Sequence, residues 1–341
     1  MKALYISHNG ELEIKDVMFE DKIAGNEVLL RICHVGFCGS DIKTFKGGNS
    51  MALNPVIPGH EIGALIERTG ENVPSYLKKG TVVTCNPYSA CGSCSSCRAG
   101  RTNACRNNRT LGVQRDGAMC EYIILPYEKV IPCSGLTTLQ SALIEPMSVG
   151  FHAVDRGRVS DNDCVLVIGC GMVGLGAIVR ASLRGARVIA ADIDDDKLEL
   201  ASKMGAAFCI NTLKTDVHAA LGELTGGDGP DVVIEAVGST ATYQMAMNEV
   251  AFCGRVVCIG YASNDVSLNT RLFVQKEMDI LGSRNSTPND FRAVIRYMQS
   301  GACPVESLVT RTIKPSEALE TLRWWSDNPG KVFRIVVDFR S

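Results

Sequence analysis

The sequence has no long hydrophobic run, no excess of charge of one sign and no apolar leader at its start. No stretch of about 18 apolar residues occurs, so we expect no membrane-spanning segment. The formal net charge is −2, which argues against nucleic acid or an anionic membrane as a partner. Residues 1–16 (MKALYISHNGELEIKD) lack the apolar core of a secretion signal. We therefore expect a protein of the reducing cytoplasm that acts on small molecules.

Cysteine, by contrast, is abundant, and four of the fifteen cysteines stand close together in residues 91–105 (CGSCSSCRAGRTNAC). Disulfides are not expected in a reducing compartment. A bacterial iron–sulfur site would end in C-x3-C-P, whereas Arg106 follows the last cysteine here. Four thiolates at this spacing can enclose one Zn²⁺ in a closed tetrahedral site. We predict a structural zinc lobe over about residues 85–106, with four ligands: Cys91, Cys94, Cys97 and Cys105.

The length of 341 residues exceeds what one hydrophobic core usually supports, so two domains are expected. Residues 1–149 contain short β-prone runs separated by turn signals, which favours an irregular β-barrel-like domain. In residues 150–284 apolar runs alternate with helical stretches, which predicts an α/β doubly wound parallel sheet. The remaining helix and strand of residues 285–341 are too few for a domain, so we expect them to return to the first one.

A dinucleotide-binding turn is predicted where an apolar strand runs into a helix, at residues 165–192. Its first glycine allows a tight turn, its second close approach of a pyrophosphate, and its third close packing of helix on strand. Asp192 ends the next strand, where a carboxylate binds ribose hydroxyls and repels a 2′-phosphate, so NAD is favoured over NADP. A flavin site and a turn without function are the alternatives. The expected contacts are Gly169, Gly171, Met172, Val173, Gly174 and Asp192, with Ala236, Val237, Ile259 and Tyr261 at the carboxyl ends of two further strands.

A catalytic metal site is suggested by three separate motifs: GFCGSD at 36–41, GHE at 59–61 and EP at 145–146. A catalytic zinc needs three protein ligands and one open position. Cys38, His60 and a carboxylate would supply them. From spacing alone, Cys38 as a core residue and His60 as a turn residue remain alternatives.

Together these motifs resemble the zinc-dependent medium-chain dehydrogenase/reductase superfamily, which includes sorbitol, alcohol and threonine dehydrogenases. The resemblance covers essentially the whole chain, and LIEPMSVGFHAV at 143–154 is closest to the polyol branch. It implies a GroES-like catalytic domain, a Rossmann domain that binds NAD, and two Zn²⁺ per subunit. It also implies that Cys38 and His60 bind the catalytic zinc and that Glu61 or Glu145 completes the site. Ser40 would begin a proton relay, whereas Lys43 stands where many relatives have histidine, which puts the later relay in doubt.

The substrate is indicated by residues 283–291 (SRNSTPNDF), which resemble bacterial sugar-acid dehydrogenases acting at C5 of L-galactonate or L-gulonate. Arg284 offers a planar fork suited to a carboxylate, and Asn285 offers a donor and an acceptor for hydroxyls. Arg115 is a second cationic candidate. The alternatives are an L-threonine 3-dehydrogenase, a sorbitol or other polyol dehydrogenase, and a zinc- and nucleotide-binding module without catalysis. The resemblance further implies a homo-oligomer, either a dimer or a tetramer, with residues 255–262 (RVVCIGYA) as a candidate edge strand.

Overall fold

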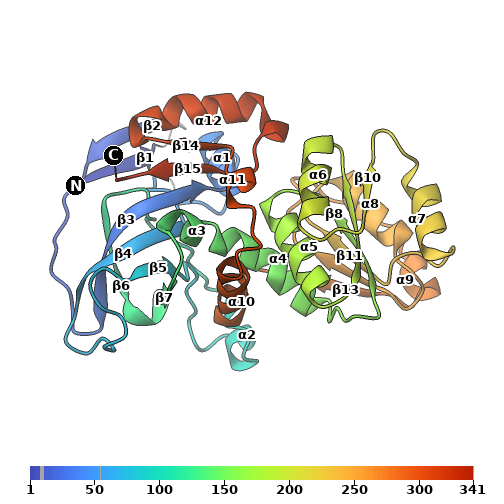
Figure 1. Ribbon diagram of the computed structural model, residues 1–341, viewed down its shortest axis with the longest axis horizontal. Helices are drawn as coiled ribbons and strands as arrows, with labels where there is room; N and C mark the ends of the chain where they lie inside the picture. The colour runs from blue at the N-terminus through green and yellow to red at the C-terminus, as the bar shows by residue number, and fades with distance from the viewer. Residues whose placement is uncertain (8–10, 54, 341) are drawn as a thin grey trace. The chain divides into compact units, whose positions relative to one another are not determined.

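The computed structural model describes residues 1–7, 11–53 and 55–340 (Figure 1). The chain forms two compact units. The first unit comprises residues 1–146 and 291–341, and the second comprises residues 147–290. Two helices, α4 (Ile144–Arg156) and α10 (Pro288–Gln299), each run across one of the two boundaries.

The first unit is built on a seven-stranded sheet in which strands distant in sequence pair with one another. Its longest strand, β3 (Glu27–Phe37), pairs antiparallel with β4 (Glu61–Thr69), with β6 (Tyr122–Pro126) and with the C-terminal β15 (Ile335–Asp338). The C-terminal segment therefore completes the sheet that the N-terminal part begins. The other strands are β5 (Val82–Cys85), β7 (Val130–Pro132) and β14 (Arg311–Ile313), and β1 (Lys2–Ile6) and β2 (Leu12–Asp16) form a separate pair.

Apolar residues of β3 and β4 pack into the core of this unit. The sheet is irregular because β3 and β4 shift register twice, between Leu29 and Leu30 and between Ile32 and His34. Short helices and 3₁₀ turns accompany it in the described part of the chain. The helices are α1 (Gly39–Phe45), α2 (Ser95–Arg98), α3 (Thr138–Ala142), α11 (Val305–Leu308) and α12 (Ala318–Asp327), and the 3₁₀ turns are Thr102–Ala104, Tyr127–Lys129, Pro315–Glu317 and Pro329–Lys331.

The second unit is a six-stranded parallel sheet in the order β10-β9-β8-β11-β12-β13. This is the doubly wound order, with a topological switch between β8 and β11. The central strands are buried on both faces, and all five residues of β8 are buried. The strands are β8 (Cys164–Ile168), β9 (Arg187–Asp192), β10 (Phe208–Asn211), β11 (Val232–Glu235), β12 (Arg255–Cys258) and β13 (Asp279–Gly282), and the helices are α5 (Met172–Leu183), α6 (Asp195–Lys203), α7 (Val217–Thr225), α8 (Thr240–Glu249) and α9 (Arg271–Gln275).

The predicted edge strand is the one element that the sheet contradicts. Residues 255–262 begin as β12, which pairs with β11 on one side and with β13 on the other. The edge is instead β13, a short strand whose Ile280 is 43% exposed. Because interior and edge strands of a parallel sheet can both be apolar, composition alone did not reveal the extra strand.

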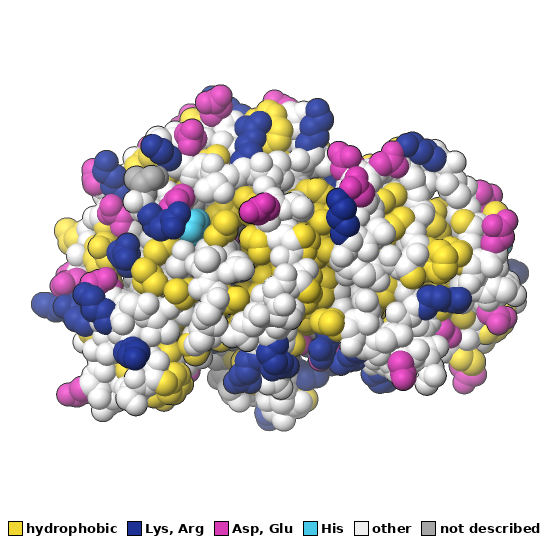
Figure 2. Space-filling model, in the orientation of Figure 1, with side chains coloured by type: hydrophobic (Ala, Val, Ile, Leu, Met, Phe, Trp, Pro, Cys, Tyr) yellow, Lys and Arg dark blue, Asp and Glu magenta, His cyan; other side chains and the backbone are white. Residues whose placement is uncertain are grey.

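The exterior carries charges of both signs. Acidic and basic side chains both occur across the face drawn in Figure 2, in keeping with the small net charge. Among the described residues, no helix combines the length and the apolar character that crossing a lipid bilayer requires.

Candidate active site

Three of the predicted metal ligands come together in the first unit. One ligand atom each from Cys38, His60 and Glu61 lies within 4.8 Å of the others. Cys38 follows the end of β3, and Glu61 begins β4, so the antiparallel pairing of Gly36 with Glu61 brings the two segments together. A Cβ at Gly36 would lie 2.0 Å from Oε2 of Glu61, so only glycine leaves room for this carboxylate.

The donor atoms of this cluster, hereafter the assembled cluster, are buried without enough partners. Nδ1 of His60 and both carboxylate oxygens of Glu61 have no hydrogen-bond partner among the residues that the structure describes. Oε1 of Glu61 does lie 3.0 Å from Nη1 of Arg334, within ion-pair range but without the alignment of a hydrogen bond. Buried polar atoms are rarely left in this state, and a thiolate, an imidazole and a carboxylate are the usual ligands of Zn²⁺. The residues therefore fit a bound zinc ion.

Electrostatics within the assembled cluster favour the metal-binding protonation state of Cys38. Burial by itself raises the pKa of this thiol, but the hydrogen bond and charge of His60 lower it to about 7. Burial opposes a charge on His60, yet Cys38 and the nearby carboxylates hold the pKa of His60 well above its ordinary value. Burial also raises the pKa of Glu61 well above its usual range, against the opposing charge of Arg334. A cation at this point would relieve the repulsion between the acidic groups.

Glu145 lies beside the assembled cluster rather than within it. It is buried in the first turn of α4, and the hydroxyl of Tyr88 donates a hydrogen bond to its Oε1. Its negative charge raises the pKa of both His60 and Glu61. Among the described residues, the carboxylate within ligand distance of Cys38 and His60 is thus that of Glu61.

Helix α1 carries the other predicted catalytic residues. Ser40 has a buried Oγ without a hydrogen-bond partner in the described part of the chain, whereas Lys43 is exposed. Asp41, which the sequence reasoning quoted only as part of a motif, is fully buried and accepts a hydrogen bond from the Cys38 amide at 2.8 Å. Burial raises the pKa of Asp41, and the charge of His60 opposes this effect. A buried acid beside a metal ligand orients that ligand.

The four clustered cysteines also converge, within 4.8 Å of one another. Sγ of Cys94 lies 3.5 Å from that of Cys97 and 3.8 Å from that of Cys105, too far for disulfides, which need about 2.0 Å. Hydrogen bonds from Ser96 and from backbone amides lower the pKa of Cys94 to about 5. Gly92 and Gly100, both with φ of +74°, form the turns that bring the chain back on itself. This thiolate lobe fits a closed zinc site.

In the second unit, the glycine turn lies between β8 and α5. Gly169 has φ of +94°, which glycine adopts readily. A Cβ at Gly174 would lie 1.8 Å from the carbonyl oxygen of Gly169, so the helix and the turn require glycine there. Gly171 is the residue before α5 and faces open space, as close approach of a phosphate to the helix N-terminus requires. Met172 and Val173 form the first turn of α5.

Asp192 ends β9, and backbone amides hold its carboxylate in place. Cys170 donates to Oδ2 at 2.7 Å, and Ile193 and Asp194 donate to Oδ1 at 2.8 and 3.1 Å. Because the Cys170 amide belongs to the glycine turn, the carboxylate is fixed beside the expected pyrophosphate position. Three further aspartates follow at 194–196, a run of negative charge that disfavours a 2′-phosphate.

The loops after β11 and β12 contain the remaining predicted cofactor residues, Ala236, Val237, Ile259 and Tyr261. Glu235, which sequence reasoning missed, organises these loops. Its Oε1 accepts hydrogen bonds from the amides of Val237 and Gly238 and from the hydroxyl of Thr242, at 2.7–2.9 Å. Val237 and Tyr261 are 51% and 59% exposed, so both can contact a ligand.

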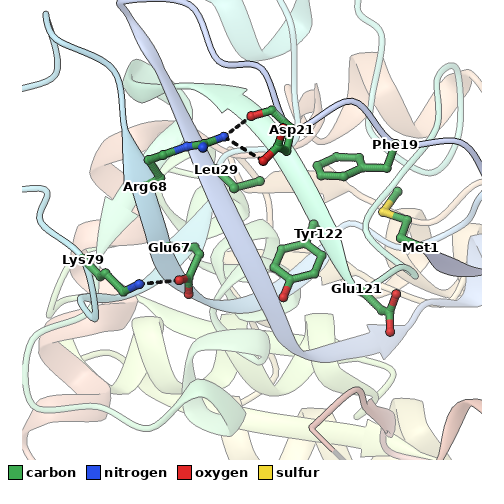
Figure 3. Close-up of a pocket in the computed structure, with 9 residues that line it drawn as sticks. All are labelled: Met1, Phe19, Asp21, Leu29, Glu67, Arg68, Lys79, Glu121 and Tyr122. Carbon is green, nitrogen blue, oxygen red and sulfur yellow. Dashed lines mark hydrogen bonds and ion pairs between the residues drawn. The ribbon is translucent and has the colours of Figure 1, made fainter.

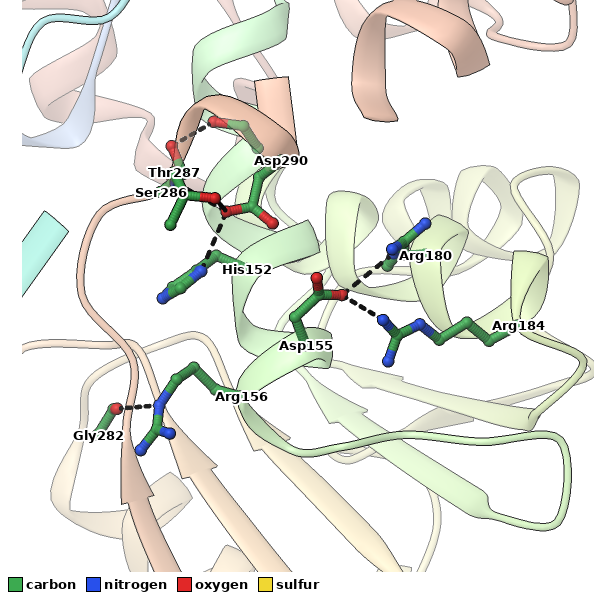
Figure 4. A network of polar contacts seen from close by, with 10 residues as sticks. His152, Asp155, Arg156, Arg180, Arg184, Gly282, Ser286, Thr287 and Asp290 are labelled. Carbon is green, nitrogen blue, oxygen red and sulfur yellow. Dashed lines mark hydrogen bonds and ion pairs between the residues drawn. The ribbon is translucent and has the colours of Figure 1, made fainter. Parts of the chain in front are cut away.

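The segment with Arg284 and Asn285 follows β13. Hydrogen bonds to Asp290 hold its C-terminal end, as Figure 4 shows. Nδ1 of His152 lies 3.0 Å from Oδ2 of Asp290, which also accepts the Thr287 amide and hydroxyl at 2.7 Å. Asn285 has φ of +55°, a left-handed conformation that is uncommon outside glycine and typical of functional loops. Elsewhere in the network, Asp155 of α4 pairs with two arginines of the α5 region, Arg180 and Arg184.

Comparisons with known proteins decide the family. The alcohol dehydrogenase GroES-like domain matches residues 24–135, and the zinc-binding dehydrogenase domain matches residues 173–300. L-galactonate-5-dehydrogenase of Escherichia coli (strain K12) is 33% identical, with 92% of each chain covered. The chain belongs to the zinc-dependent medium-chain dehydrogenase/reductase family. The predicted family and fold are confirmed, and the protein is an oxidoreductase of this family.

Other members of this dehydrogenase family are similar over nearly the whole chain. Sorbitol dehydrogenase of Bacillus subtilis (strain 168) is 34% identical, covering 91% of this chain and 89% of its own. Among solved structures, galactitol-1-phosphate dehydrogenase from Escherichia coli has a TM-score of 0.91 at 26% identity, covering 99% of this chain and 100% of its own. The rspB alcohol dehydrogenase of Escherichia coli CFT073, complexed with NADH, has a TM-score of 0.90 at 27% identity and covers 99% of both chains. These similarities support membership of the zinc-dependent polyol and sugar-acid dehydrogenase family.

Proposed function

We propose that the protein oxidises a secondary alcohol of a sugar acid, at C5 of an L-galactonate or L-gulonate type of substrate, with NAD as the hydride acceptor. The observation that carries the proposal is the assembled cluster of buried, under-partnered zinc ligands. The similarity to L-galactonate-5-dehydrogenase supports the substrate class. The similarity to a structure with NADH and the fixed carboxylate of Asp192 support the cofactor.

In this mechanism Cys38, His60 and Glu61 would hold the catalytic ion, and the four cysteines of the thiolate lobe would hold a structural one. A zinc ion bound there lowers the pKa of a substrate hydroxyl as a Lewis acid. Asp41 fixes the segment of Cys38 through its backbone amide. Arg334 lies within ion-pair range of Glu61, so this buried carboxylate has a counter-charge of its own in the protein. Glu145 is a second carboxylate beside the cluster, and a hydrogen bond from the Tyr88 hydroxyl holds it in place.

The proton from the substrate hydroxyl goes first to Ser40, whose buried Oγ is not committed to another described group. Lys43, one turn further along α1 and exposed, is a suitable point of transfer to solvent. On the cofactor side, Asp192 would bind the ribose and the amides of Met172 and Val173 would bind the pyrophosphate. Four further residues would contact the nicotinamide half: Ala236, Val237, Ile259 and Tyr261. Arg284 and Asn285 bind polar groups of the substrate.

The first test is NADH formation with NAD and a panel of alcohols: L-galactonate, L-gulonate, L-idonate, D-sorbitol, L-threonine and ethanol. We expect the highest kcat/KM with a sugar acid. The similarity to sorbitol dehydrogenase makes a neutral polyol the second candidate, and preference for D-sorbitol would move the protein to that branch. Metal analysis should give two Zn²⁺ per chain. No turnover with any of the six alcohols in the zinc-loaded protein would refute the proposal.

We also propose a cytoplasmic homo-oligomer, a dimer or a tetramer, that pairs through β13. No described strand pairs with the outer side of β13, and Val274, a few residues before it in α9, is 84% exposed. Sedimentation of the wild type against Ile280→Lys tests it, since a charge on the edge strand should dissociate the oligomer. An unchanged sedimentation coefficient would exclude this interface.

A further inference from the structure

The first unit contains three neighbouring cations with too little negative charge around them: Arg109, Arg115 and Lys129. Burial and then the charge of Arg109 lower the pKa of Arg115, and no carboxylate offsets them. Burial and then the charge of Arg115 lower the pKa of Lys129, with Glu128 opposing weakly. Nε of Arg115 is buried and has no hydrogen-bond partner, and the residue makes no ion pair with any described residue. Arg115 is half-buried, and a half-buried guanidinium without a counter-charge is stabilised when a ligand supplies one.

This cation group lies against the turn that leads to His60. The amides of Gly117, Ala118 and Met119 donate to the carbonyl oxygens of residues 57, 59 and 58 at 2.7–2.9 Å. The Gly112 amide donates to the carbonyl of Arg115 at 2.8 Å, and a Cβ at Gly112 would lie 2.4 Å from the nitrogen of residue 59. The turn that carries Arg115 is thus packed, backbone on backbone, against the residue before a metal ligand.

A second route joins the cations to the assembled cluster. Nζ of Lys129 donates to the carbonyl oxygen of Tyr88, and the hydroxyl of Tyr88 donates to Glu145. The charge of Glu145 in turn acts on His60 and Glu61. The cations and the zinc ligands therefore flank one region of the first unit.

Three other cations, Arg68, Lys79 and Arg284, each have an interaction partner. Figure 3 shows a surface pocket of about 570 Å³ in the first unit where Arg68 is paired with Asp21 and Lys79 with Glu67. No residue of the assembled cluster lines it. Arg284, the cation favoured by the sequence, also has an interaction partner in the structure. Nε of Arg334 also has no hydrogen-bond partner among the described residues, but Arg334 forms an ion pair with Glu61. Arg115 combines an open Nε with the lack of any such ion pair to a described residue.

We propose that Arg115, supported by Arg109 and Lys129, forms an anion subsite of the active centre that binds the carboxylate or phosphate group of the alcohol substrate. The inference rests on the proposed function and assigns the charged end of the substrate to the first unit, leaving Arg284 and Asn285 for hydroxyls. A guanidinium binds either oxyanion through two parallel, charge-assisted hydrogen bonds. A neutral polyol leaves the cation uncompensated, so the subsite selects anionic substrates.

The test compares wild type, Arg115→Met and Arg115→Lys with L-galactonate, galactitol 1-phosphate and neutral galactitol. We expect Arg115→Met to raise KM for the preferred anionic substrate about 10- to 100-fold, with little change in kcat or in the kinetics of galactitol. Arg115→Lys should restore part of the loss. Whichever anion has the lower KM identifies the group bound. Arg68→Met, which removes a paired arginine of the same unit, is the matched control and should leave all three substrates unchanged.

Two outcomes would overturn the inference while leaving the proposed function intact. One is an equal rise in KM for galactitol and the anions in Arg115→Met, which would mark a structural role. The other is an unaffected Arg115→Met beside an Arg284→Met variant that loses the anion preference. If no substrate were turned over, the proposed function would fail. Calorimetric titration with L-galactonate and inorganic phosphate would then still test the anion subsite. Binding by wild type but not by Arg115→Met would support the subsite, and equal or absent binding would refute it.

Discussion

The thiolate lobe and the assembled cluster are both groups of side chains that could hold a metal ion, yet the chain builds them in opposite ways. The lobe takes all four ligands from fifteen consecutive residues, and two left-handed glycines and one short helix bring them together. The assembled cluster takes Cys38 from the end of β3 and His60 and Glu61 from the start of β4. Its electrostatics depend on Arg334, almost 300 residues further on than Cys38.

Because of this difference, we expect the thiolate lobe to affect mainly stability and the assembled cluster to affect mainly catalysis. A closed set of four thiolates leaves no position for a substrate, so its metal can only hold the chain together. The assembled cluster has three ligands and buried atoms without partners, which leaves a position open and leaves the site dependent on the surrounding sheet. The two sites should therefore respond differently to the same chemical change.

Replacing a thiolate of the assembled cluster should have the largest effect on turnover. In Cys38→Ser we expect kcat to fall about a thousand-fold or more, since a lost ligand forfeits several kcal/mol of Lewis-acid stabilisation. Zinc content should fall towards one per chain, with a small change in Tm. NADH formation and thermal unfolding measure both. Cys209→Ser, an exposed cysteine outside both sites, is the control. Retention of wild-type kcat would exclude Cys38 as a ligand.

The same substitution in the thiolate lobe should instead reduce stability. Cys97→Ser should lose one zinc and several kcal/mol of folding free energy, which lowers Tm by roughly 10 °C. Folded Cys97→Ser should keep KM values close to wild type. If its kcat fell as far as that of Cys38→Ser, the separation of the two sites would be wrong.

The second unit offers a similar comparison, because its glycine turn is a local motif whereas Asp192 comes from the end of the next strand, β9. Asp192→Ala removes a charge-assisted contact to the ribose and should raise KM for NAD about 10- to 100-fold. The discrimination against NADP should fall as well. Asp196→Ala changes an exposed aspartate of the same run and should behave like wild type in steady-state kinetics with both cofactors. Equal losses in the two variants would indicate a general charge effect.

The smallest effect is expected at the periphery of the assembled cluster. Tyr88→Phe removes the hydroxyl that holds Glu145 and should reduce kcat/KM by roughly tenfold or less, because one hydrogen bond is lost and the ring remains. Tm and KM for NAD should stay near wild type. A change in NAD binding as large as the change in kcat/KM would show that Tyr88 does not act through Glu145.

Much of the architecture was predictable because its signals are local. The glycine turn, the alternation of strands and helices, and the cysteine spacing each lie within a short window, and the structure has these features where they were expected. Glu61 and Glu145 could not be ranked from sequence, since their distances to Cys38 depend on how β3, β4 and α4 pack. Asp41, Tyr88, Glu235 and Arg334 carried no comparable signal. Only burial and partners identify them.

The sequence by itself determined the family, the doubly wound sheet and the existence of a thiolate lobe, because each depends on residue types at fixed short spacings. The tertiary structure decided which strand forms the edge of the sheet and which carboxylate stands with Cys38 and His60. It also left the buried Nε of Arg115 without a hydrogen-bond partner among the described residues. These properties arise from contacts between segments far apart in the chain, where burial and electrostatics act on whatever the fold brings together.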